Sequence, residues 1–317
     1  MDIKLLLFKQ HSYNMWEYDD DYINRIAALG YDVVLHPTEG LSLPEEAYTC
    51  EVLATVGIFQ HENIDDFKNL KFIQVLAAGF DHFPADKIKE RKIILANMRG
   101  VYGIPISEFV LSGILNVYKQ SRVFDSQKKD RVFRRKQDLI EIYGKTAAIL
   151  GTGDLGFQIA KRLQAFGAKV IGFNRHPLPS DCFDEVHSID HAGDFLPQVD
   201  IVILTLPLSD DSFHLAGKDF FRSMKPGSVF VNVGRGAVCD EGALVDALKN
   251  KLLLAAVLDV YEKEPLPINS PLWDLENVFL YPHTMSGSDN AFGRMKETLY
   301  RNLKAYAECK ELENRFF

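Results

Sequence analysis

Three segments of this sequence carry side chains that could bind an anion and move a proton, and each follows directly on an apolar stretch. Arg235 is flanked by Gly234 and Gly236, a setting in which a guanidinium suits the binding of a carboxylate or phosphate. The acidic segment 258–265 and His283 follow the next two apolar stretches. Histidine is well suited to proton transfer near neutral pH. A lone histidine is more often structural, but three such groups at the strand ends of one sheet favour a catalytic site.

A glycine-rich turn indicates a dinucleotide site. Residues 151–156, Gly-Thr-Gly-Asp-Leu-Gly, lie between a strand pattern at 146–150 and a helical pattern. Gly151 permits the tight turn, Gly153 lets a pyrophosphate approach the backbone, and Gly156 lets the helix pack closely on the strand. The helix N-terminus adds unpaired N–H groups and the positive end of the helix dipole. We therefore predict a Rossmann-type site, beside which an arginine, a carboxylate and a histidine would serve hydride transfer.

The end of the next strand indicates which dinucleotide binds. An NAD site usually has Asp or Glu there to bind the ribose hydroxyls, whereas this chain has Asn174, Arg175 and His176. Without the carboxylate a 2′-phosphate is not repelled, and the fork of Arg175 suits it. The alternative is that Asn174 binds the ribose as a neutral substitute while Arg175 points to solvent. NADP is therefore the preferred prediction and NAD the alternative.

The order of strands and helices predicts how these groups are positioned. Short apolar strands alternate with helical patterns in both halves of the chain, which is typical of α/β folds with a parallel sheet covered on both faces. The charged stretch 121–138 is interpreted as a solvated helical connection, with a dimerisation arm as the alternative. A helical pattern at 291–314 could return to the first half. The expected strands are residues 4–8, 32–35, 55–59, 72–76, 93–96, 146–150, 169–173, 200–204, 228–233, 254–258 and 278–280.

Composition excludes several classes of protein. The chain has 317 residues, 47% hydrophobic and 25% charged, which suits two globular domains. The net charge of −8 comes without a basic stripe, so no nucleic-acid partner is expected. No signal peptide or bilayer-spanning apolar run is found, so no membrane association is expected. Four scattered cysteines lack metal-ligand spacing, which predicts no metal site and reduced thiols in the cytoplasm.

Several motifs together resemble those of the D-isomer-specific 2-hydroxyacid dehydrogenases, over essentially the whole chain. Besides the glycine turn, they are Leu206-Pro207-Leu208, Lys225-Pro226-Gly227, and the stretches VNVGRG, LDVYEKEPLP and SPLWDLENVFLYPH. The resemblance implies that Arg235 binds the substrate carboxylate and polarises the carbonyl group. It implies that His283 is the acid/base and Glu264 its carboxylate partner, with Glu262 as the competing assignment.

The resemblance also implies two Rossmann-like domains. A doubly wound parallel-sheet dinucleotide-binding domain (99–287) is inserted in a smaller flavodoxin-like substrate domain (1–98 and 288–317), with the active site in the cleft between them. Ala77, Ala78 and Gly79 match the family's substrate-binding loop, whose N–H groups contact the carboxylate. Family members usually dimerise through the cofactor domain, so a homodimer is expected. The residues assigned to the cofactor are Ile106, Gly151, Gly153, Asp154, Leu155, Gly156, Asn174, Arg175, His176, Thr205, Leu206, Pro207, Val233, Gly234, Arg235, Asp259, His283 and Ser286.

These inferences predict an NAD(P)H-dependent oxidoreductase that reduces a small 2-keto acid, such as glyoxylate, hydroxypyruvate or pyruvate, to a D-2-hydroxy acid. One alternative is a phosphoglycerate-type dehydrogenase, in which Arg99 could meet a distal phosphate. Another is a non-enzymatic, dinucleotide-sensing protein that resembles transcriptional corepressors. Two positions depart from the family pattern. Met285, within Thr284-Met285-Ser286, is expected to alter the lining of the substrate pocket, and Phe133 stands where relatives often have Trp.

Overall fold

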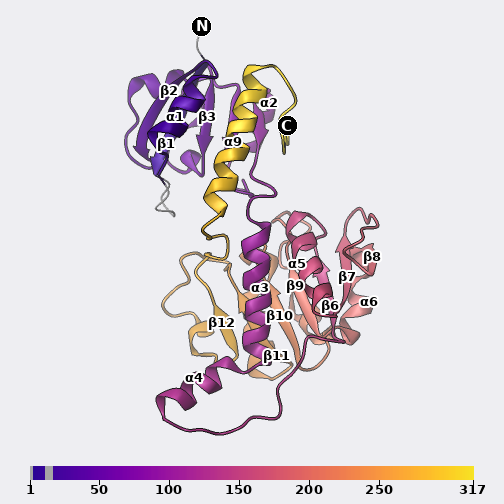
Figure 1. Cartoon of the computed structure of the whole chain (residues 1–317). Helices are drawn as coiled ribbons and strands as arrows, with labels where there is room; N and C mark the ends of the chain where they lie inside the picture. The colour runs from indigo at the N-terminus through magenta and orange to yellow at the C-terminus, as the bar shows by residue number, and fades with distance from the viewer. Residues whose placement is uncertain (1–2, 11–16) are drawn as a thin grey trace. The chain divides into compact units, whose positions relative to one another are not determined.

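The computed structural model describes residues 3–10 and 17–317, and the chain divides into two compact units. Unit 1 comprises Met1–Tyr102 and Ser288–Phe317, and unit 2 comprises Gly103–Gly287. Each unit is built on one parallel sheet with helices on both faces (Figure 1), so the predicted α/β fold with two Rossmann-like domains is confirmed.

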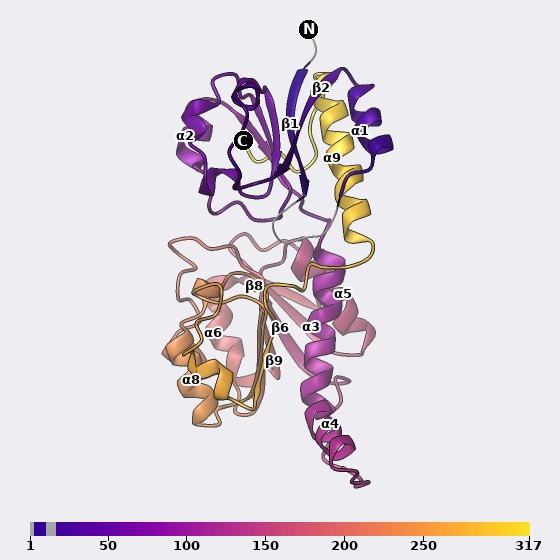
Figure 2. The same ribbon diagram turned by 90° about the vertical axis from the view of Figure 1, so that its left-hand side faces the viewer.

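Unit 1 contains a five-stranded parallel sheet. Its strands are β1 (Ile3–Gln10), β2 (Tyr31–Thr38), β3 (Val52–Thr55), β4 (Phe72–Val75) and β5 (Ile94–Ala96). They lie in the order β2-β1-β3-β4-β5, which is the flavodoxin-like order. Helices α1 (Asp20–Ala27) and α9 (Ala291–Ala307) cover one face, and α2 (Ala85–Glu90) covers the other (Figure 2).

The continuous apolar sequence of β1 follows from this layering. Leu5 and Leu7 pack in the core that α1 and α9 share, whereas Leu6 and Phe8 pack in the core on the opposite face. All four side chains are fully buried. A central strand covered on both faces needs apolar residues at successive positions instead of an apolar–polar alternation.

Unit 2 contains a seven-stranded parallel sheet. Its strands are β6 (Thr146–Leu150), β7 (Lys169–Asn174), β8 (Glu185–Ser188), β9 (Ile201–Leu204), β10 (Ser228–Asn232), β11 (Leu253–Leu258) and β12 (Val278–Leu280). The order β12-β11-β10-β9-β6-β7-β8 is the doubly wound dinucleotide-binding order with one further strand at the β12 edge. The winding reverses between β6 and β9, which is where open α/β sheets bind their ligands.

Helices cover both faces of the second sheet as well. One face is covered by α3 (Gly103–Tyr118) and α5 (Asp154–Ala165), and the other by α6 (Ala192–Phe195), α7 (Lys218–Ser223) and α8 (Glu241–Lys249) (Figure 2). Helix α3 packs very closely on β11. A Cβ added at Gly113 would lie only 2.6 Å from a methyl carbon of Val257, so the helix has no room for a side chain there. The charged stretch forms α4 (Ser121–Lys129), which buries none of its residues.

Several predicted elements differ from the structure. The expected strand at 55–59 lies instead at Val52–Thr55, where it pairs with β1, and the Thr55 hydroxyl then accepts from the N–H of Ile58 to start a 3-10 turn. Strand β8 was not predicted, because its four half-buried residues form no apolar run. Helix α9 ends at Ala307 instead of continuing to 314, and Cys309 has a left-handed φ of 54°.

The remaining short elements are 3-10 turns, and none of them belongs to a sheet. They span Glu45–Thr49, Ile58–Gln60, Ile64–Asp66, Ile189–His191, Leu196–Gln198, Gly236–Val238 and Pro271–Asp274. Within residues 3–10 and 17–317, no helix combines the length and the apolar character that a membrane crossing requires.

Candidate active site

The glycine turn between β6 and α5 has the shape that a dinucleotide pyrophosphate needs. Gly151 has a φ of 111°, and a Cβ there would lie 2.4 Å from Oγ1 of Thr205. A Cβ at Gly156 would lie 2.0 Å from the carbonyl oxygen of Gly151, so helix and strand pack too closely for a side chain. A Cβ at Gly153 would meet nothing within 4 Å. Close packing therefore requires glycine at positions 151 and 156, whereas Gly153 keeps a space open.

The open space lies at the N-terminus of α5. Gly153 is the N-cap residue of this helix, and no side chain caps it. The first N–H groups of a helix carry partial positive charge and suit phosphate oxygens. The residues of the turn thus fit the pyrophosphate of NAD or NADP, at the point where the winding of the sheet reverses.

The predicted cofactor and catalytic residues of unit 2 gather at one edge of its sheet. The carboxyl ends of parallel strands share an edge, and all these residues except Ile106, on α3, end or follow a strand there. Gly151, Gly153, Asp154, Leu155 and Gly156 follow β6; Asn174, Arg175 and His176 end or follow β7; Thr205, Leu206 and Pro207 follow β9; Val233, Gly234 and Arg235 follow β10; Asp259 follows β11; His283 and Ser286 follow β12.

The end of β7 is organised around Asn174. Its Nδ2 donates to Oγ1 of Thr152, 2.9 Å away, and its Oδ1 accepts from the N–H of Arg175. Arg175 is exposed, and its Nη2 lies 2.5 Å from an oxygen of Asp211. Asp211 could not be predicted from the sequence, because it lies 36 positions from Arg175 and only the fold pairs the two.

Arg235 stands in a turn that Asn232 holds. Asn232 is buried at the end of β10, where its Oδ1 accepts from the N–H of Gly234 and its Nδ2 donates to the carbonyl oxygen of Arg235 at 3.0 Å. The Arg235 side chain is half-buried and donates to the carbonyl oxygen of Gly234. Asn232 was not predicted as a site residue, although a polar residue at the end of an apolar strand is a usable signal.

His283 and Glu264 form a hydrogen-bonded pair. Nδ1 of His283 lies 2.7 Å from Oε2 of Glu264, and the other carboxylate oxygen accepts from the N–H of Tyr261 at 3.0 Å. The hydrogen bond and charge of Glu264 raise the pKa of His283 above its ordinary value, against the effects of burial and of Arg235. Because Nδ1 is engaged with Glu264, Nε2 is the ring nitrogen left for a substrate.

The interaction with His283 also changes the pKa of the Glu264 carboxylate. Burial favours the neutral form of Glu264, but the hydrogen bonds from His283 and Tyr261 and the charges of His283 and Arg235 outweigh it, so its pKa lies below the usual value. The positive charge of Arg235 thus lowers the pKa of both Glu264 and His283. The structure brings Arg235, Glu264 and His283 together at the ends of adjacent strands β10, β11 and β12.

The competing carboxylate takes part in a different interaction. Glu262 accepts from the N–H of Glu241 at 2.9 Å and lies 3.1 Å from Nε2 of His214. Between the two segments, the hydroxyl of Tyr261 donates to the carbonyl oxygen of Tyr281 at 2.8 Å. Tyr261 therefore connects the segment of Glu264 to that of His283, a role that no local sequence pattern predicts.

Asp259 holds the loop that carries His283. Its buried carboxylate accepts from the N–H of Thr284 at 2.8 Å and of Met285 at 3.2 Å, and its carbonyl oxygen accepts from the N–H of His283. His283 has a φ of 50°, a left-handed conformation that is uncommon outside glycine and asparagine. Burial raises the pKa of Asp259, and these N–H groups counteract part of that effect.

The expectation that Met285 lines the substrate pocket is wrong. Its side chain is fully buried in the core between the sheet and α3 and α5, with Val110, Ile114 and Val257. A long, flexible thioether fills irregular gaps in a core well. Phe133, the other departure, is fully exposed.

The remaining predicted residues, Ala77, Ala78 and Gly79, follow β4 at the carboxyl edge of the sheet in unit 1. In the described part of the chain, no group of three or more His, Cys, Asp or Glu is arranged to hold a metal ion.

Comparison with known proteins agrees with this geometry. Residues 111–285 match the model of the D-isomer specific 2-hydroxyacid dehydrogenase NAD binding domain. A glyoxylate reductase of Thermofilum pendens is 33% identical over 258 residues, covering 77% of this chain and 74% of that protein. Glyoxylate/hydroxypyruvate reductase B of an Enterobacter species is 30% identical over 248 residues, covering 76% of both chains.

A solved structure shows the same fold over the whole length. The structure of a D-isomer specific 2-hydroxyacid dehydrogenase family protein from Aeromonas salmonicida has a TM-score of 0.81 at 27% identity, and the match covers 100% of this chain and 99% of that one. The chain belongs to the D-isomer-specific 2-hydroxyacid dehydrogenase family. It is an oxidoreductase that uses a nicotinamide dinucleotide and acts on the CH–OH group of small 2-hydroxy acids.

Proposed function

We propose that this enzyme reduces a small 2-keto acid to the D-2-hydroxy acid with NADPH, using Arg235, Glu264 and His283. The observation that carries the proposal is the 2.7 Å contact between Nδ1 of His283 and Glu264. This pair shares a sheet edge with the dinucleotide turn, and the charge of Arg235 acts on it. A cation, a proton donor and a dinucleotide site at one edge are the parts that reduction of a keto acid requires.

The chemistry follows from where charge develops. When bound, the reduced nicotinamide supplies a hydride to the carbonyl carbon. As negative charge grows on the carbonyl oxygen, the guanidinium of Arg235 stabilises it and Nε2 of His283 gives up its proton. In the oxidative direction the neutral imidazole takes that proton back.

Glu264 prepares His283 for this role. One carboxylate oxygen is fixed by the N–H of Tyr261 while the other holds Nδ1, so the imidazole ring is oriented before substrate binds. The carboxylate charge favours the imidazolium, which is the form that donates a proton. We therefore assign Glu264 the role of keeping the acid protonated.

We assign the substrate carboxylate to Arg235 and to the N–H groups of Ala78 and Gly79. The carbonyl oxygens of Ala77 and Ala78 accept from the N–H of Met98 and from Nδ2 of Asn97, at 3.0 and 2.6 Å. Within the described residues, the N–H groups of Ala78 and Gly79 donate to no other group. A carboxylate is well matched to a pair of unpaired backbone N–H groups.

The preference for NADPH is proposed from the end of β7. Asn174 has no negative charge to repel a 2′-phosphate, and Arg175 is paired with Asp211 at the surface, where both side chains are exposed. Such a pair is worth about 0–1 kcal/mol. A phosphate carries more charge and more acceptor oxygens than Asp211, so it competes well for Arg175.

We also propose a homodimer that acts in the cytoplasm. Helix α4 and the segment after it expose Val123, Phe124, Val132 and Phe133, which a partner subunit would cover. All four cysteines lie in described residues and none is in a disulfide, which fits a reducing compartment. Light scattering tests the first point, because Phe133→Asp should shift the protein from dimer to monomer.

A panel of 2-keto acids assayed with NADPH and with NADH tests the proposal. We expect turnover of glyoxylate, hydroxypyruvate or pyruvate, and a lower KM for NADPH than for NADH. Arg175→Ala should reduce the preference for NADPH about tenfold, and Asp211→Asn should increase it. A phosphorylated keto acid is included, and its exclusive use would replace the proposal with a phosphoglycerate-type activity. No turnover of any keto acid would overturn it.

A further inference from the structure

A buried asparagine shapes the loop that we assign to the substrate carboxylate. Asn97 follows β5 and is only 6% exposed. Its Nδ2 donates to the carbonyl oxygen of Ala78 at 2.6 Å, and its Oδ1 accepts from the N–H of Arg99 at 3.2 Å. In a trans peptide the carbonyl and the following N–H point in opposite directions, so the bond from Asn97 to the Ala78 carbonyl turns the N–H of Gly79 away from Asn97. The bond from Met98 to the Ala77 carbonyl sets the N–H of Ala78 in the same way.

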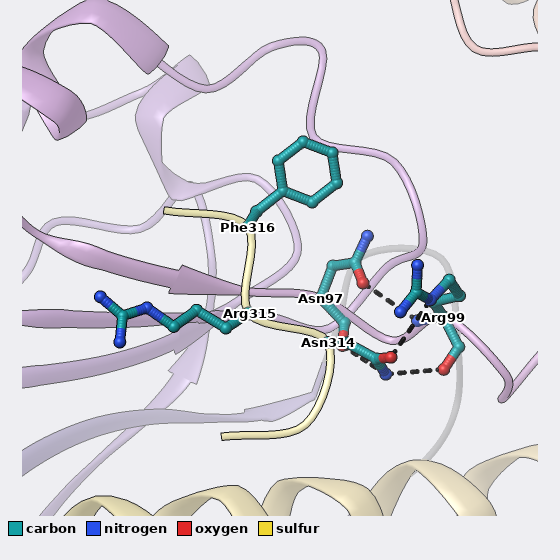
Figure 3. A pocket seen from close by; sticks show the side chains of 5 residues that line it. All are labelled: Asn97, Arg99, Asn314, Arg315 and Phe316. Carbon is teal, nitrogen blue, oxygen red and sulfur yellow. Dashed lines mark hydrogen bonds between the residues drawn. The ribbon is translucent and has the colours of Figure 1, made fainter. Parts of the chain in front are cut away.

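Asn97 is itself held by the chain that follows α9. The N–H of Asn97 donates to the carbonyl oxygen of Asn314 at 3.3 Å. Nδ2 of Asn314 donates to the carbonyl oxygens of Asn97 and Arg99, at 3.4 and 2.7 Å, and its Oδ1 accepts from Nε of Arg99. Figure 3 shows these three side chains joined in one cluster, with Arg315 and Phe316 turned away from it.

The residues after Asn314 dock on the edge of the sheet and reach the same loop. Arg315 forms an antiparallel bridge with Ala96, and the N–H of Phe316 donates to the carbonyl oxygen of Leu95 at 2.8 Å. The ring of Phe316 packs edge-on against Phe80, with 4.6 Å between the ring centroids and 74° between the planes. Phe80 is the residue directly after Gly79, so the segment 314–316 contacts the loop directly through Phe316 and indirectly through Asn97.

We propose that Asn97 is a positioning residue for the substrate carboxylate and that the segment 314–316 holds it in place. This role rests on the proposed function, since it concerns the affinity of that site for keto acids. The segment thus does more than close the sheet edge: it connects the chain beyond α9 to the substrate loop. Neither Asn97 nor Phe316 touches the reacting atoms in this role.

The decisive variant is Asn97→Asp. Aspartate has the same shape, but it places an oxygen instead of an N–H group against the carbonyl oxygen of Ala78, so the two groups repel each other. The peptide between Ala78 and Gly79 must then turn, and the N–H of Gly79 loses its direction. We expect KM for the 2-keto acid to rise about tenfold or more, because a buried acceptor loses its donor.

The second variant tests the contact made by the segment. Phe316→Ala should raise KM for the keto acid about 2- to 10-fold, the range expected for loss of an aromatic pair. Phe316→Leu keeps an apolar contact with Phe80 and should recover most of the loss. Asn69→Asp is the matched control, because Asn69 is an exposed residue of unit 1 that donates to the carbonyl oxygen of Thr49.

The readouts are KM for the keto acid, kcat, and the dissociation constant of NADPH measured by its fluorescence. A positioning role predicts that KM changes in Asn97→Asp and Phe316→Ala while NADPH binding and the control stay as in the wild type. A purely structural role would lower kcat and NADPH binding together, and that result would overturn the proposal. Wild-type turnover with an unchanged KM in Asn97→Asp would overturn this role alone, whereas an inactive wild type would overturn the proposed function and this role with it.

Discussion

Replacement of Glu264 by glutamine separates the charge of this residue from its shape. The amide oxygen of glutamine can still accept a hydrogen bond from Nδ1 of His283, but it has no negative charge to stabilise the imidazolium. The raised pKa of His283 arises first from this hydrogen bond and carboxylate. Activity in the reductive direction requires the protonated ring, so it is full below that pKa and falls as the pH rises through it. In Glu264→Gln this alkaline fall must therefore move to lower pH.

The size of the effect follows from the geometry. Unit charges about 4 Å apart interact by about 1 kcal/mol in water and about 4 kcal/mol at an effective dielectric constant of about 20. The side chains of His283 and Glu264 are 55% and 36% exposed, which favours the lower half of that range. A value of about 1–2 kcal/mol corresponds to a loss of about 5- to 30-fold in kcat/KM on the alkaline side.

The assay is the pH profile of kcat/KM for keto acid reduction, followed by the absorbance of the reduced nicotinamide. Glu262→Gln is the matched control, since it removes a carboxylate two positions away that binds Glu241 and His214 instead. The control should keep the wild-type profile. An unchanged alkaline limb in Glu264→Gln, or an equal shift in the control, would refute the assigned role of Glu264.

Two further perturbations test the cofactor turn and the anion site. Gly156→Ala should lower the free energy of unfolding by about 3 kcal/mol or more, measured by urea titration, because its Cβ would lie 2.0 Å from a carbonyl oxygen. Gly153→Ala should leave that free energy within about 1 kcal/mol yet weaken NADPH binding about tenfold or more, since its methyl group fills the open space; equal effects of the two variants would contradict this. Arg235→Gln should raise KM for the keto acid about 10- to 100-fold at saturating NADPH, and an unchanged KM would remove Arg235 from the carboxylate site.

The sequence predicted the fold well wherever a strand is apolar and buried. The expected bounds 146–150 and 278–280 agree with β6 and β12, because each apolar run is followed by residues that cannot continue it, such as Gly151 and Pro282. Strand β8 escaped prediction because it is a half-buried, mostly polar edge strand. Within the mostly apolar stretch 52–59, pairing with β1 and β4 decides which residues form the strand.

The sequence predicted the reactive side chains of the site better than the residues that hold them in place. Arg235 and His283 could be found because they directly follow strands of one sheet, and resemblance favoured Glu264 over Glu262. Asn232 and Tyr261 hold the backbone of the segments that carry Arg235 and His283, through hydrogen bonds that form only in the folded chain. No local pattern encodes such contacts, and the same holds for Asn97 and the segment that holds it.

The central claim is that the imidazole of His283 supplies the proton in keto acid reduction. His283→Asn tests it most directly, because asparagine tolerates the left-handed backbone of this position and so preserves the loop. We expect kcat, measured at saturating NADPH, to fall about 10²- to 10⁴-fold. A variant that reduces the keto acid at the wild-type rate would contradict it.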